Sequence, residues 1–378
     1  MRLAIINYTG GGMSGGYKNY LKKLLPRIAI RDDIEAILCA TPEIVKIDSL
    51  MKGLKNTKFI NCKPFGFLNI SSDLSLFRNL EEFSPDILFI PVERYLNFKD
   101  VPVVNLIQNM EPFVSNGDFN PLPERLRQLL KYLYGKRAIK KSDGIIALSK
   151  FVVGMLKIRS KNKIKLIYHG IDQNKFRQNH KPSNISDTWV GKFVFTAGSI
   201  RCARGLEDIL SAINYIKTQK NHNVKLVIAG KVDLGMQNYK KKLVQYIVKN
   251  NLSSEIHWVG NINEQEMNWC YKNCSMFVMT SRVESFGMIA GEAMANGCLC
   301  ISSSSPCLPE IFNNSALFYE KNNFTDLGDK ILKVLNLNQT TKEEMSLQAV
   351  NQSKQFSWDI CADRTVDFLK HIISSHKS

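Results

Sequence analysis

The 378-residue sequence lacks any apolar run that approaches the roughly 20 residues of a membrane-spanning helix. Its first residues, MRLAIINYTGGG, also lack the charged, apolar and cleavage regions of a signal peptide. We therefore expect a cytoplasmic protein. Its 44% of hydrophobic and 22% of charged residues are ordinary for a globular protein, and its length predicts two domains rather than one.

Cysteine is present but lacks the pattern of a disulfide framework. The nine cysteines are odd in number and scattered among apolar residues, which predicts buried, reduced thiols. Cys270 with Cys274, or Cys298 with Cys300, could be half of a zinc site, but no second pair at metal-ligand spacing accompanies them. No D-x-D pair follows a predicted strand. We therefore expect neither a bound metal nor a cofactor.

Acidic residues are scarce, with 34 Asp and Glu against 51 Lys and Arg and a net charge of +17. The excess lies in the first half, because residues 1–187 hold 30 basic and 17 acidic residues whereas 188–378 hold 21 and 17. Such a surface attracts nucleic acid, anionic lipid headgroups or phosphorylated substrates. A basic nucleic-acid-binding protein remains an alternative, although aromatic RNA-binding motifs, zinc fingers and a helix-turn-helix are lacking.

Both halves of the chain open with an apolar strand, a glycine-containing turn and a helix. The first reads RLAIINY, GGGMSGG and YKNYLKKLLPRIA, and the second reads KFVFTAGSI, RCARG and LEDILSAINYIK. This order opens a doubly wound domain. Further strands are expected at 34–40, 86–91, 101–108, 144–149 and 164–170, and then at 225–230, 256–260, 276–281 and 298–304. The pattern predicts an α/β protein with two Rossmann-like parallel-sheet domains.

The domain boundary is expected in the polar, Pro/Ser/Asn-rich stretch 173–190. This gives an N-terminal domain over 1–187 and a C-terminal domain over 188–360. The last helical stretch, WDICADRTVDFLKHIISS, has no strand after it. We expect a C-terminal helix over 361–378 that can cross back to the first domain.

Two acids stand out in RVESFGMIAGEAMANG, residues 282–297. Glu284 follows the strand MFVMTS directly, where the carboxyl ends of parallel strands form a ligand crevice. The next helix is expected to begin at Phe286, and the free amide groups of Phe286, Gly287 and Met288 in its first turn, together with its dipole, can hold a phosphate without a cation. Ser285, the last residue of the loop before it, is also expected at the donor. Glu292 lies about two turns further on among small residues, which suits a diol such as a ribose.

The segment ESFGMIAGEA resembles the E-x7-E signature of the retaining GT-B glycosyltransferases of family four, which have two Rossmann-like domains facing a cleft. Further segments resemble sequences of the same family: SDGIIALSKF, YHGIDQNKF, FTAGSIRCARGLEDIL, LVIAG, IHWVGNI and FSW. The resemblance implies that Glu284 approaches the donor sugar and that Glu292 binds the nucleotide ribose. It also implies a nucleotide-sugar donor, UDP- or GDP-linked, and a saccharide or lipid-linked acceptor.

The resemblance implies further donor-binding residues. Where relatives carry an arginine and then a lysine after the first C-domain strand, this chain has Ser199 and Arg204, and Arg201 can supply the second charge. Gly15 and Gly16 of the first loop are expected at the donor, and Ile262 belongs to a variable pocket loop. Helix dipole and arginines, rather than a metal, are then expected to stabilise the leaving nucleotide.

The acceptor side departs from the family. Many relatives place a histidine after the middle N-domain strand, but this chain has no histidine before His169 and reads NLIQNMEPF there. Gln108, Asn109 or Glu111 stands in that place. An amide can bind sugar hydroxyls but cannot act as a general base, so Glu111 is the candidate for acceptor activation. With no obvious second nucleophile, front-side attack assisted by the leaving phosphate is expected.

The stretch PERLRQLLKYLYGKRAIKK, residues 123–141, carries seven basic residues and one acid. Its apolar stripe, formed by Leu126, Leu129, Leu130, Leu133 and Tyr134, indicates either a core-packing helix with a solvated basic face or an interfacial anchor. We expect peripheral contact with an anionic membrane, at the inner face of the cell membrane.

The predicted function is a glycosyltransferase of surface polysaccharide, lipopolysaccharide or glycolipid synthesis. A nucleotide-sugar epimerase or a phosphorylase of the same architecture is the alternative enzyme, and no pyridoxal lysine supports the latter.

Overall fold

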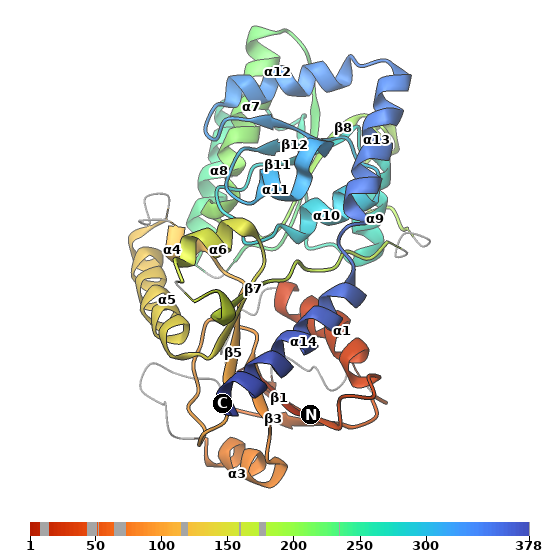
Figure 1. Cartoon of the computed structure of the whole chain (residues 1–378). Helices are drawn as coiled ribbons and strands as arrows, with labels where there is room; N and C mark the ends of the chain where they lie inside the picture. The colour runs from red at the N-terminus through yellow and green to blue at the C-terminus, as the bar shows by residue number, and fades with distance from the viewer. Residues whose placement is uncertain are drawn as a thin grey trace. The chain divides into compact units, whose positions relative to one another are not determined.

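The computed structural model describes residues 1–7, 15–43, 51, 53–63, 73–114, 120–158, 160–173, 179–233 and 235–377. The chain forms two compact units (Figure 1). Unit 1 contains Met1–Asn116, Arg125–Gly170 and Ser357–Ser378, and unit 2 contains Gly117–Glu124 and Ile171–Phe356. The division thus falls at 170 and 356, whereas the sequence predicts 187 and 360. Two contacts account for the earlier division: Gly170 packs against Trp358 in unit 1, and the His180 amide donates to the Gln265 carbonyl in unit 2.

Unit 1 is built on a parallel sheet of seven strands in the order β3-β2-β1-β4-β5-β6-β7. The strands are β1 (Arg2–Ile6), β2 (Ala36–Thr41), β3 (Thr57–Asn61), β4 (Ile87–Ile90), β5 (Val103–Ile107), β6 (Gly144–Ala147) and β7 (Ile164–Leu166). Its described helices are α1 (Gly15–Ala29), α3 (Leu74–Phe83), α4 (Glu111–Val114), α5 (Leu122–Lys141), α6 (Lys150–Leu156) and α14 (Trp358–Lys377). The chain winds in opposite directions from β1 and β4, so their carboxyl ends form the topological switch point of this sheet.

Unit 2 is built on a parallel sheet of six strands in the order β10-β9-β8-β11-β12-β13. The strands are β8 (Phe193–Ala197), β9 (Lys225–Ala229), β10 (Ile256–Gly260), β11 (Met276–Met279), β12 (Cys300–Ser303) and β13 (Ala316–Tyr319). Its described α-helices are α7 (Leu206–Gln219), α8 (Gln237–Lys249), α9 (Glu264–Asn273), α10 (Met288–Ala295), α11 (Leu308–Phe312), α12 (Phe324–Leu335) and α13 (Gln339–Ser353). Here the switch point lies between β8 and β11.

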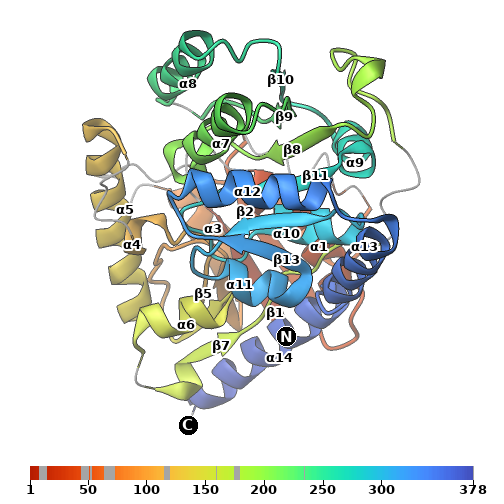
Figure 2. The same cartoon turned by 90° about the horizontal axis from the view of Figure 1, so that it is seen from above.

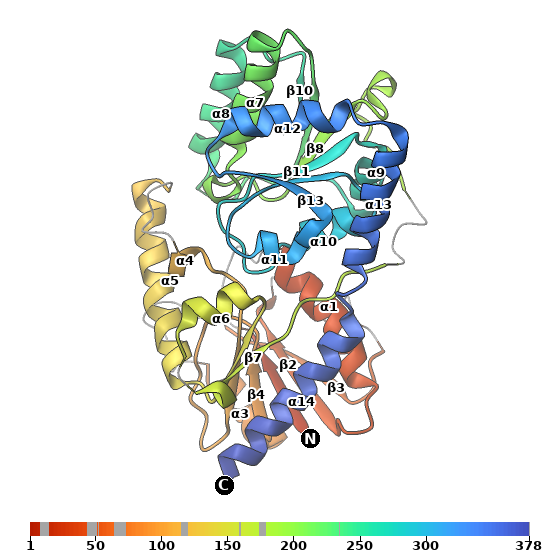
Figure 3. The ribbon, with the colours of Figure 1, turned by 45° about the horizontal axis from the view of Figure 1, so that its top comes forward.

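Helices cover both sheets, which explains why the sequences of the central strands are continuous runs of apolar residues. In unit 2, α7 packs beside α12 (Figure 2), and α10 packs beside α13 (Figure 3). The central strands β8 and β11 are almost fully buried. The fold class predicted from the sequence, two parallel-sheet α/β domains, is therefore confirmed.

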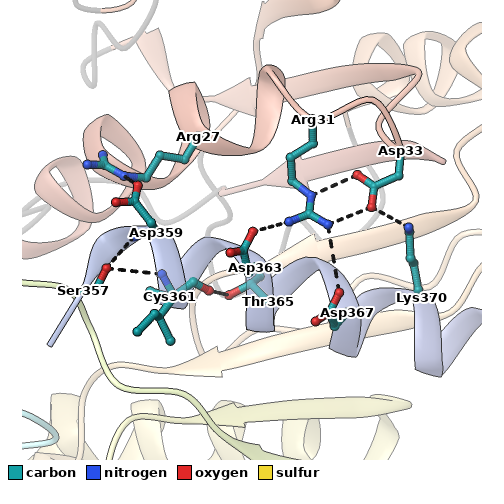
Figure 4. A network of polar contacts seen from close by, with 11 residues as sticks. Arg27, Arg31, Asp33, Ser357, Asp359, Cys361, Asp363, Thr365, Asp367 and Lys370 are labelled. Carbon is teal, nitrogen blue, oxygen red and sulfur yellow. Dashed lines mark hydrogen bonds and ion pairs between the residues drawn. The ribbon is translucent and has the colours of Figure 1, made fainter. Parts of the chain in front are cut away.

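The C-terminal helix α14 packs on α1 in unit 1, where a network of charged residues ties the two helices together (Figure 4). The Arg31 guanidinium pairs with Asp33 and with Asp363 of α14, and Arg27 pairs with Asp359. Lys370 returns to Asp33. These pairs hold the pKa of Asp33 well below its usual range, chiefly through the Arg31 hydrogen bonds.

An aromatic cluster lies under the start of α14. The ring of His169 stands 5.0 Å from that of Tyr20 and 5.8 Å from that of Trp358, measured between centroids. His169 is buried, and burial lowers its pKa to about 3. His169 is therefore part of the packing of unit 1.

The nine cysteines are unpaired thiols, and all but Cys274 are buried, as the sequence predicts. Among the described residues, no helix is both long enough and apolar enough to cross a membrane. Within the same residues, no three His, Cys, Asp or Glu side chains converge as metal ligands would.

Helix α5 exposes its leucines. The exposed fractions are 77% for Leu122, 61% for Leu126, 53% for Leu129 and 54% for Leu133. Its buried face is formed instead by Glu124, Gln128, Gly135 and Ala138. Of the predicted apolar stripe, Leu126, Leu129 and Leu133 are therefore exposed, whereas Leu130 and Tyr134 are half-buried.

Candidate functional site

Two loops meet at the switch point of unit 2, one after β8 and one after β11. The Thr280 hydroxyl donates to the Arg204 carbonyl at 2.6 Å, and the Arg282 amide donates to the Ala203 carbonyl at 2.8 Å. Behind them, Arg282 pairs with Glu207 and Asp208 at the start of α7. The crossing contacts hold both loops to one another at the carboxyl edge of the sheet, where parallel α/β sheets bind ligands.

Glycines allow this close approach. Gly198 ends β8 with φ +127°, and a Cβ there would lie 2.8 Å from the Cζ atom of Arg204. Gly230 follows β9 with φ +151°, and a Cβ there would lie 1.8 Å from the Gly198 carbonyl oxygen. A side chain at either position would therefore displace the arginine or the loop.

Arg204 and Glu284 form an ion pair at this edge, where Arg204 also lines a small pocket. Nη1 of Arg204 lies 2.5 Å from Oε1 of Glu284, and the Ser281 hydroxyl bonds to both groups at 3.0 Å. The pocket is lined by the ends of β8, β9 and β11, including Gly198, Ile200, Arg204, Thr280 and Ser281. The two side chains are only 22% and 17% exposed, so their attraction is screened less than that of a surface pair.

Arg201 adds a second guanidinium beside this pair. It precedes the short 3-10 turn 202–204, and its Nη1 lies 3.8 Å from Asp233. Burial lowers the pKa of Arg201, an effect to which Arg204 adds and which Asp233 and Glu284 oppose. The half-buried Ser199 lies in the same loop. The loop thus presents two arginines, the donors best suited to a diphosphate.

Helix α10 begins at Met288, after Gly287 in the left-handed conformation with φ +86°. The Gly287 carbonyl accepts from the amides of Ala290 and Gly291, so the amides before Ala290 lie in the turn that a helix cannot satisfy itself. The sequence places this start at Phe286, which is wrong by two residues. The Phe286 ring is buried against Phe356, 5.2 Å between centroids, which leaves only its backbone for a ligand.

Glu292 lies on the second turn of α10, where the hydroxyl of Tyr271 donates to its Oε2 at 3.3 Å. Tyr271 comes from α9 and packs edge-on against Phe195 and Phe277. Burial and the nearby carboxylate raise the pKa of this tyrosine, so it stays a hydrogen-bond donor. The sequence gives no sign of this partner, because Tyr271 sits in an ordinary helical pattern.

Other predicted donor residues are less directly placed. Gly15 and Gly16 are the first residues of α1, and the preceding glycines, Gly10 to Gly12, lie outside the described residues. Ile262 is half-buried after β10, two strands away from β8. Half-buried Ser285 lies between Glu284 and Phe286. Their roles remain predictions.

In unit 1, the segment after β5 carries the predicted acceptor-side residues. Asn109 accepts the Glu111 amide on its Oδ1 at 3.1 Å, and Glu111 opens α4 and is 3% exposed. Glu93, which follows β4, accepts the amides of Gln108 and Asn109 on one carboxylate oxygen. The sequence does not single out Glu93, because a lone acid after a strand is a common surface feature.

Comparisons with known proteins find glycosyltransferases that are similar to this chain. Residues 176–355 match the family model described as glycosyl transferases group 1. An uncharacterized glycosyltransferase of Methanocaldococcus jannaschii is 33% identical over 228 residues, which cover 60% of this chain and 59% of that protein. The O-antigen chain mannosyltransferase B of Escherichia coli is 23% identical over 48% of this chain and 46% of its own length. The matches thus span about half the length of these curated relatives.

Among solved structures, Anabaena HepE in complex with UDP-glucose has a TM-score of 0.76 at 17% identity, over 98% of this chain and 99% of that one. At this identity the likeness shows the fold, which is the GT-B arrangement of two parallel-sheet domains. The family model covers the whole segment that holds Arg204, Glu284 and Glu292. Residues 176–355, which hold these three residues, thus match the family model described as glycosyl transferases group 1.

Proposed function

We propose that the protein is a retaining glycosyltransferase that moves a sugar from a nucleotide-sugar to a saccharide or lipid-linked saccharide. The observation that carries the proposal is the arrangement at the switch point of unit 2. Arg204 pairs with Glu284 there, Arg201 stands beside them, and α10 begins a few residues after Glu284. Such a set suits a diphosphate on the arginines and helix start, with a sugar toward Glu284.

The nucleoside end of the donor is assigned to Glu292. Its carboxylate can accept two ribose hydroxyls, and the Tyr271 hydroxyl limits its rotation from the other side. The complex of HepE with UDP-glucose supports a nucleotide-sugar donor of this kind. The name of the Escherichia coli relative supports an acceptor in O-antigen or related surface saccharide synthesis.

The proposed reaction forms a bond between an acceptor hydroxyl oxygen and the anomeric carbon of the donor sugar. The bond between that carbon and the diphosphate oxygen breaks, and the hydroxyl proton passes to the leaving phosphate on the same face. Arg201 and Arg204 stabilise the charge that develops on the diphosphate. Attack on this face keeps the anomeric configuration, and the nucleoside diphosphate leaves with the proton.

The proposal is tested with a panel of UDP-, GDP- and ADP-sugars, first by thermal shift and then by product analysis. One nucleotide is expected to stabilise the protein, and its sugar is expected in the product with the donor's anomeric configuration. Conversion of the donor to its epimer without transfer would instead identify an epimerase. A lack of stabilisation by every nucleotide, together with salt-dependent RNA binding, would favour the nucleic-acid alternative.

We also propose that α5 contacts an anionic membrane surface. Its exposed leucines at 122, 126, 129 and 133 lie on one stripe, and basic residues such as Arg125, Lys136 and Arg137 flank it. An amphipathic helix of this composition buries its leucines at the headgroup boundary while its cations contact anionic lipid. The acceptor of such an enzyme can then be a lipid-linked saccharide.

Flotation with vesicles decides the membrane proposal. Wild-type protein is expected to float with phosphatidylglycerol vesicles at low salt, and a Leu126→Gln/Leu129→Gln/Leu133→Gln variant is expected to float much less. Leu347→Gln is the control, because Leu347 is 61% exposed on α13 in unit 2. Equal flotation of the triple variant and the wild type would refute the leucine stripe.

A further inference from the structure

The switch point of unit 1 carries a hydrogen-bonded relay that begins at Asn105 in β5. Its side-chain amide is fully buried and donates to the carbonyls of Ile90, Val92 and Arg94, at 2.6 to 3.1 Å. The Ser142 hydroxyl donates to its Oδ1. A buried amide satisfied on both ends fixes the loop after β4 to the neighbouring strand.

Glu93 is held in the middle of that loop. Its Oε1 accepts the amide of Gln108 at 2.5 Å and that of Asn109 at 2.7 Å, directly after β5 ends. Burial raises the pKa of Glu93, and the two amides oppose this effect by stabilising the carboxylate. Hydrogen bonds to a charged acceptor are the stronger kind, so the contact ties two loops at the carboxyl edge of the sheet.

The relay continues into the acceptor-side residues. The backbone amide of Asn109 donates to Glu93. The side-chain oxygen of Asn109 in turn accepts a hydrogen bond from the backbone amide of Glu111 at 3.1 Å. That bond lies at the first residue of α4 and sets where the short helix starts. Hydrogen bonds of three side chains, Asn105, Glu93 and Asn109, thus link the buried strand β5 to the loop after β4 and to the turn that places Glu111.

We propose that Glu93 is a positioning residue for the acceptor: it fixes the turn 108–111 so that Asn109 and Glu111 meet a sugar hydroxyl. The inference rests on the proposed glycosyltransferase function and deepens it. Two features favour this role over ordinary loop packing. Glu93 lies three residues beyond the end of β4, one of the two strands at the switch point. Its carboxylate also accepts the backbone amides of Gln108 and Asn109, the first two residues after β5.

The test compares Glu93→Met, which removes the acceptor atoms, with Glu93→Gln, which keeps an oxygen able to accept both amides. Glu82→Gln, an exposed acid on α3 in the same unit, is the matched control. Hydrogen exchange in peptides covering 105–114 measures the turn without requiring activity. Exchange at the turn is expected to rise about tenfold or more in Glu93→Met, as expected for losing bonds to a charged acceptor, and to return toward wild type in Glu93→Gln.

Kinetics supply the second readout. Glu93→Met is expected to lower kcat for transfer about tenfold or more, while the Kd of the nucleotide, bound in unit 2, stays within about twofold. Rescue by Glu93→Gln separates positioning of the turn from a need for charge. Unchanged exchange in a folded Glu93→Met protein, or an equal loss of nucleotide affinity, would overturn the proposal. If the wild type transfers no sugar from any donor, the proposed function fails, and the exchange data alone decide whether Glu93 holds the turn.

Discussion

Arg204 and Glu284 come from loops after different strands, 80 residues apart in sequence, and their side chains pair at 2.5 Å with Ser281 bonded to both. Each of the two charges thus has the other as its partner. A bound diphosphate would compete with Glu284 for Arg204, which would release the carboxylate toward the sugar. The pairing therefore orients both side chains and offsets part of the free-energy cost of burying each charge.

Replacing Glu284 with glutamine is expected to lower transfer about 100-fold or more, because the group that we propose to face the reacting sugar loses its charge. Folding should be preserved, since the amide oxygen still accepts from Ser281 and Arg204. Initial-rate kinetics and thermal unfolding measure the two effects. Glu344→Gln, an exposed acid on α13, is the control. An activity within a few-fold of wild type would remove Glu284 from the site.

Gly198→Ala is expected to weaken nucleotide binding about tenfold or more, because the new Cβ would lie 2.8 Å from the Arg204 guanidinium. The matched control is Gly191→Ala. Gly191 also has a positive φ, +72°, but a Cβ there meets no atom within 4 Å. Both variants carry the backbone strain of a left-handed alanine, so isothermal titration isolates the contact with Arg204. Equal affinities of the two variants would contradict this explanation.

Tyr271→Phe is expected to weaken nucleoside-diphosphate binding by about two- to tenfold, the range of one hydrogen bond of about 0.5–1.5 kcal/mol. The lost bond is that from the Tyr271 hydroxyl to Glu292. Tyr215→Phe removes a comparable bond to Asp329, on the outer side of α7, and should leave binding unchanged. If the affinity of Tyr271→Phe matches that of Tyr215→Phe, the tyrosine does not orient the ribose-binding carboxylate.

Activity is expected to persist in EDTA. The arginines and the start of α10 supply the positive charge that a divalent cation would otherwise bring to the diphosphate. The measurement is the initial rate before and after exhaustive chelation. A loss of turnover that Mg²⁺ or Mn²⁺ restores would show that the arginines are insufficient.

Stability is expected to fall as the pH is lowered from about 6.5 toward 5. The folded pKa of His169 is about 3 and its ordinary value is 6.5, so the unfolded state binds more protons in this window. At pH 5 the effect is at most about 2 kcal/mol. Denaturant unfolding of wild type and His169→Asn at both pH values measures this change in the free energy of unfolding. The change between the two pH values should be smaller in the variant, because it lacks the histidine. Asp33 acts in a separate window, because its stabilisation is lost only below its ordinary value near 3.8.

Most of the fold could be predicted because buried parallel strands are continuous apolar runs. Two strands were not predicted, β3 with TKFIN and β13 with ALFY. Each lies at an edge of its sheet and is only partly buried, so its sequence carries no such run.

The leucine stripe of α5 shows a related limit. Helical spacing tells which residues share a face, but not whether protein or solvent covers that face.

The candidate donor site was predictable in part because Arg204 and Glu284 lie in the segments after β8 and β11, and Glu292 lies on the second turn of the helix that follows Glu284. Glu93 and Tyr271 were not, because each acts through a partner distant in the sequence. Glu93 receives amides from beyond β5, and Tyr271 reaches Glu292 from another helix. Only the strand order, which is a property of the folded sheet, brings them to those partners.

The docking of α14 on α1 has a consequence for synthesis on the ribosome. The strands of unit 1 are made first, but Trp358, which packs with Tyr20 and His169, is made only after the whole of unit 2. Until then, Arg27 of α1 and Arg31 just after it lack their partners Asp359 and Asp363 of α14. Unit 2 ends at Phe356, so the ribosome has made all of its chain before it makes α14. The last element of unit 1 is therefore made after unit 2 is complete in sequence.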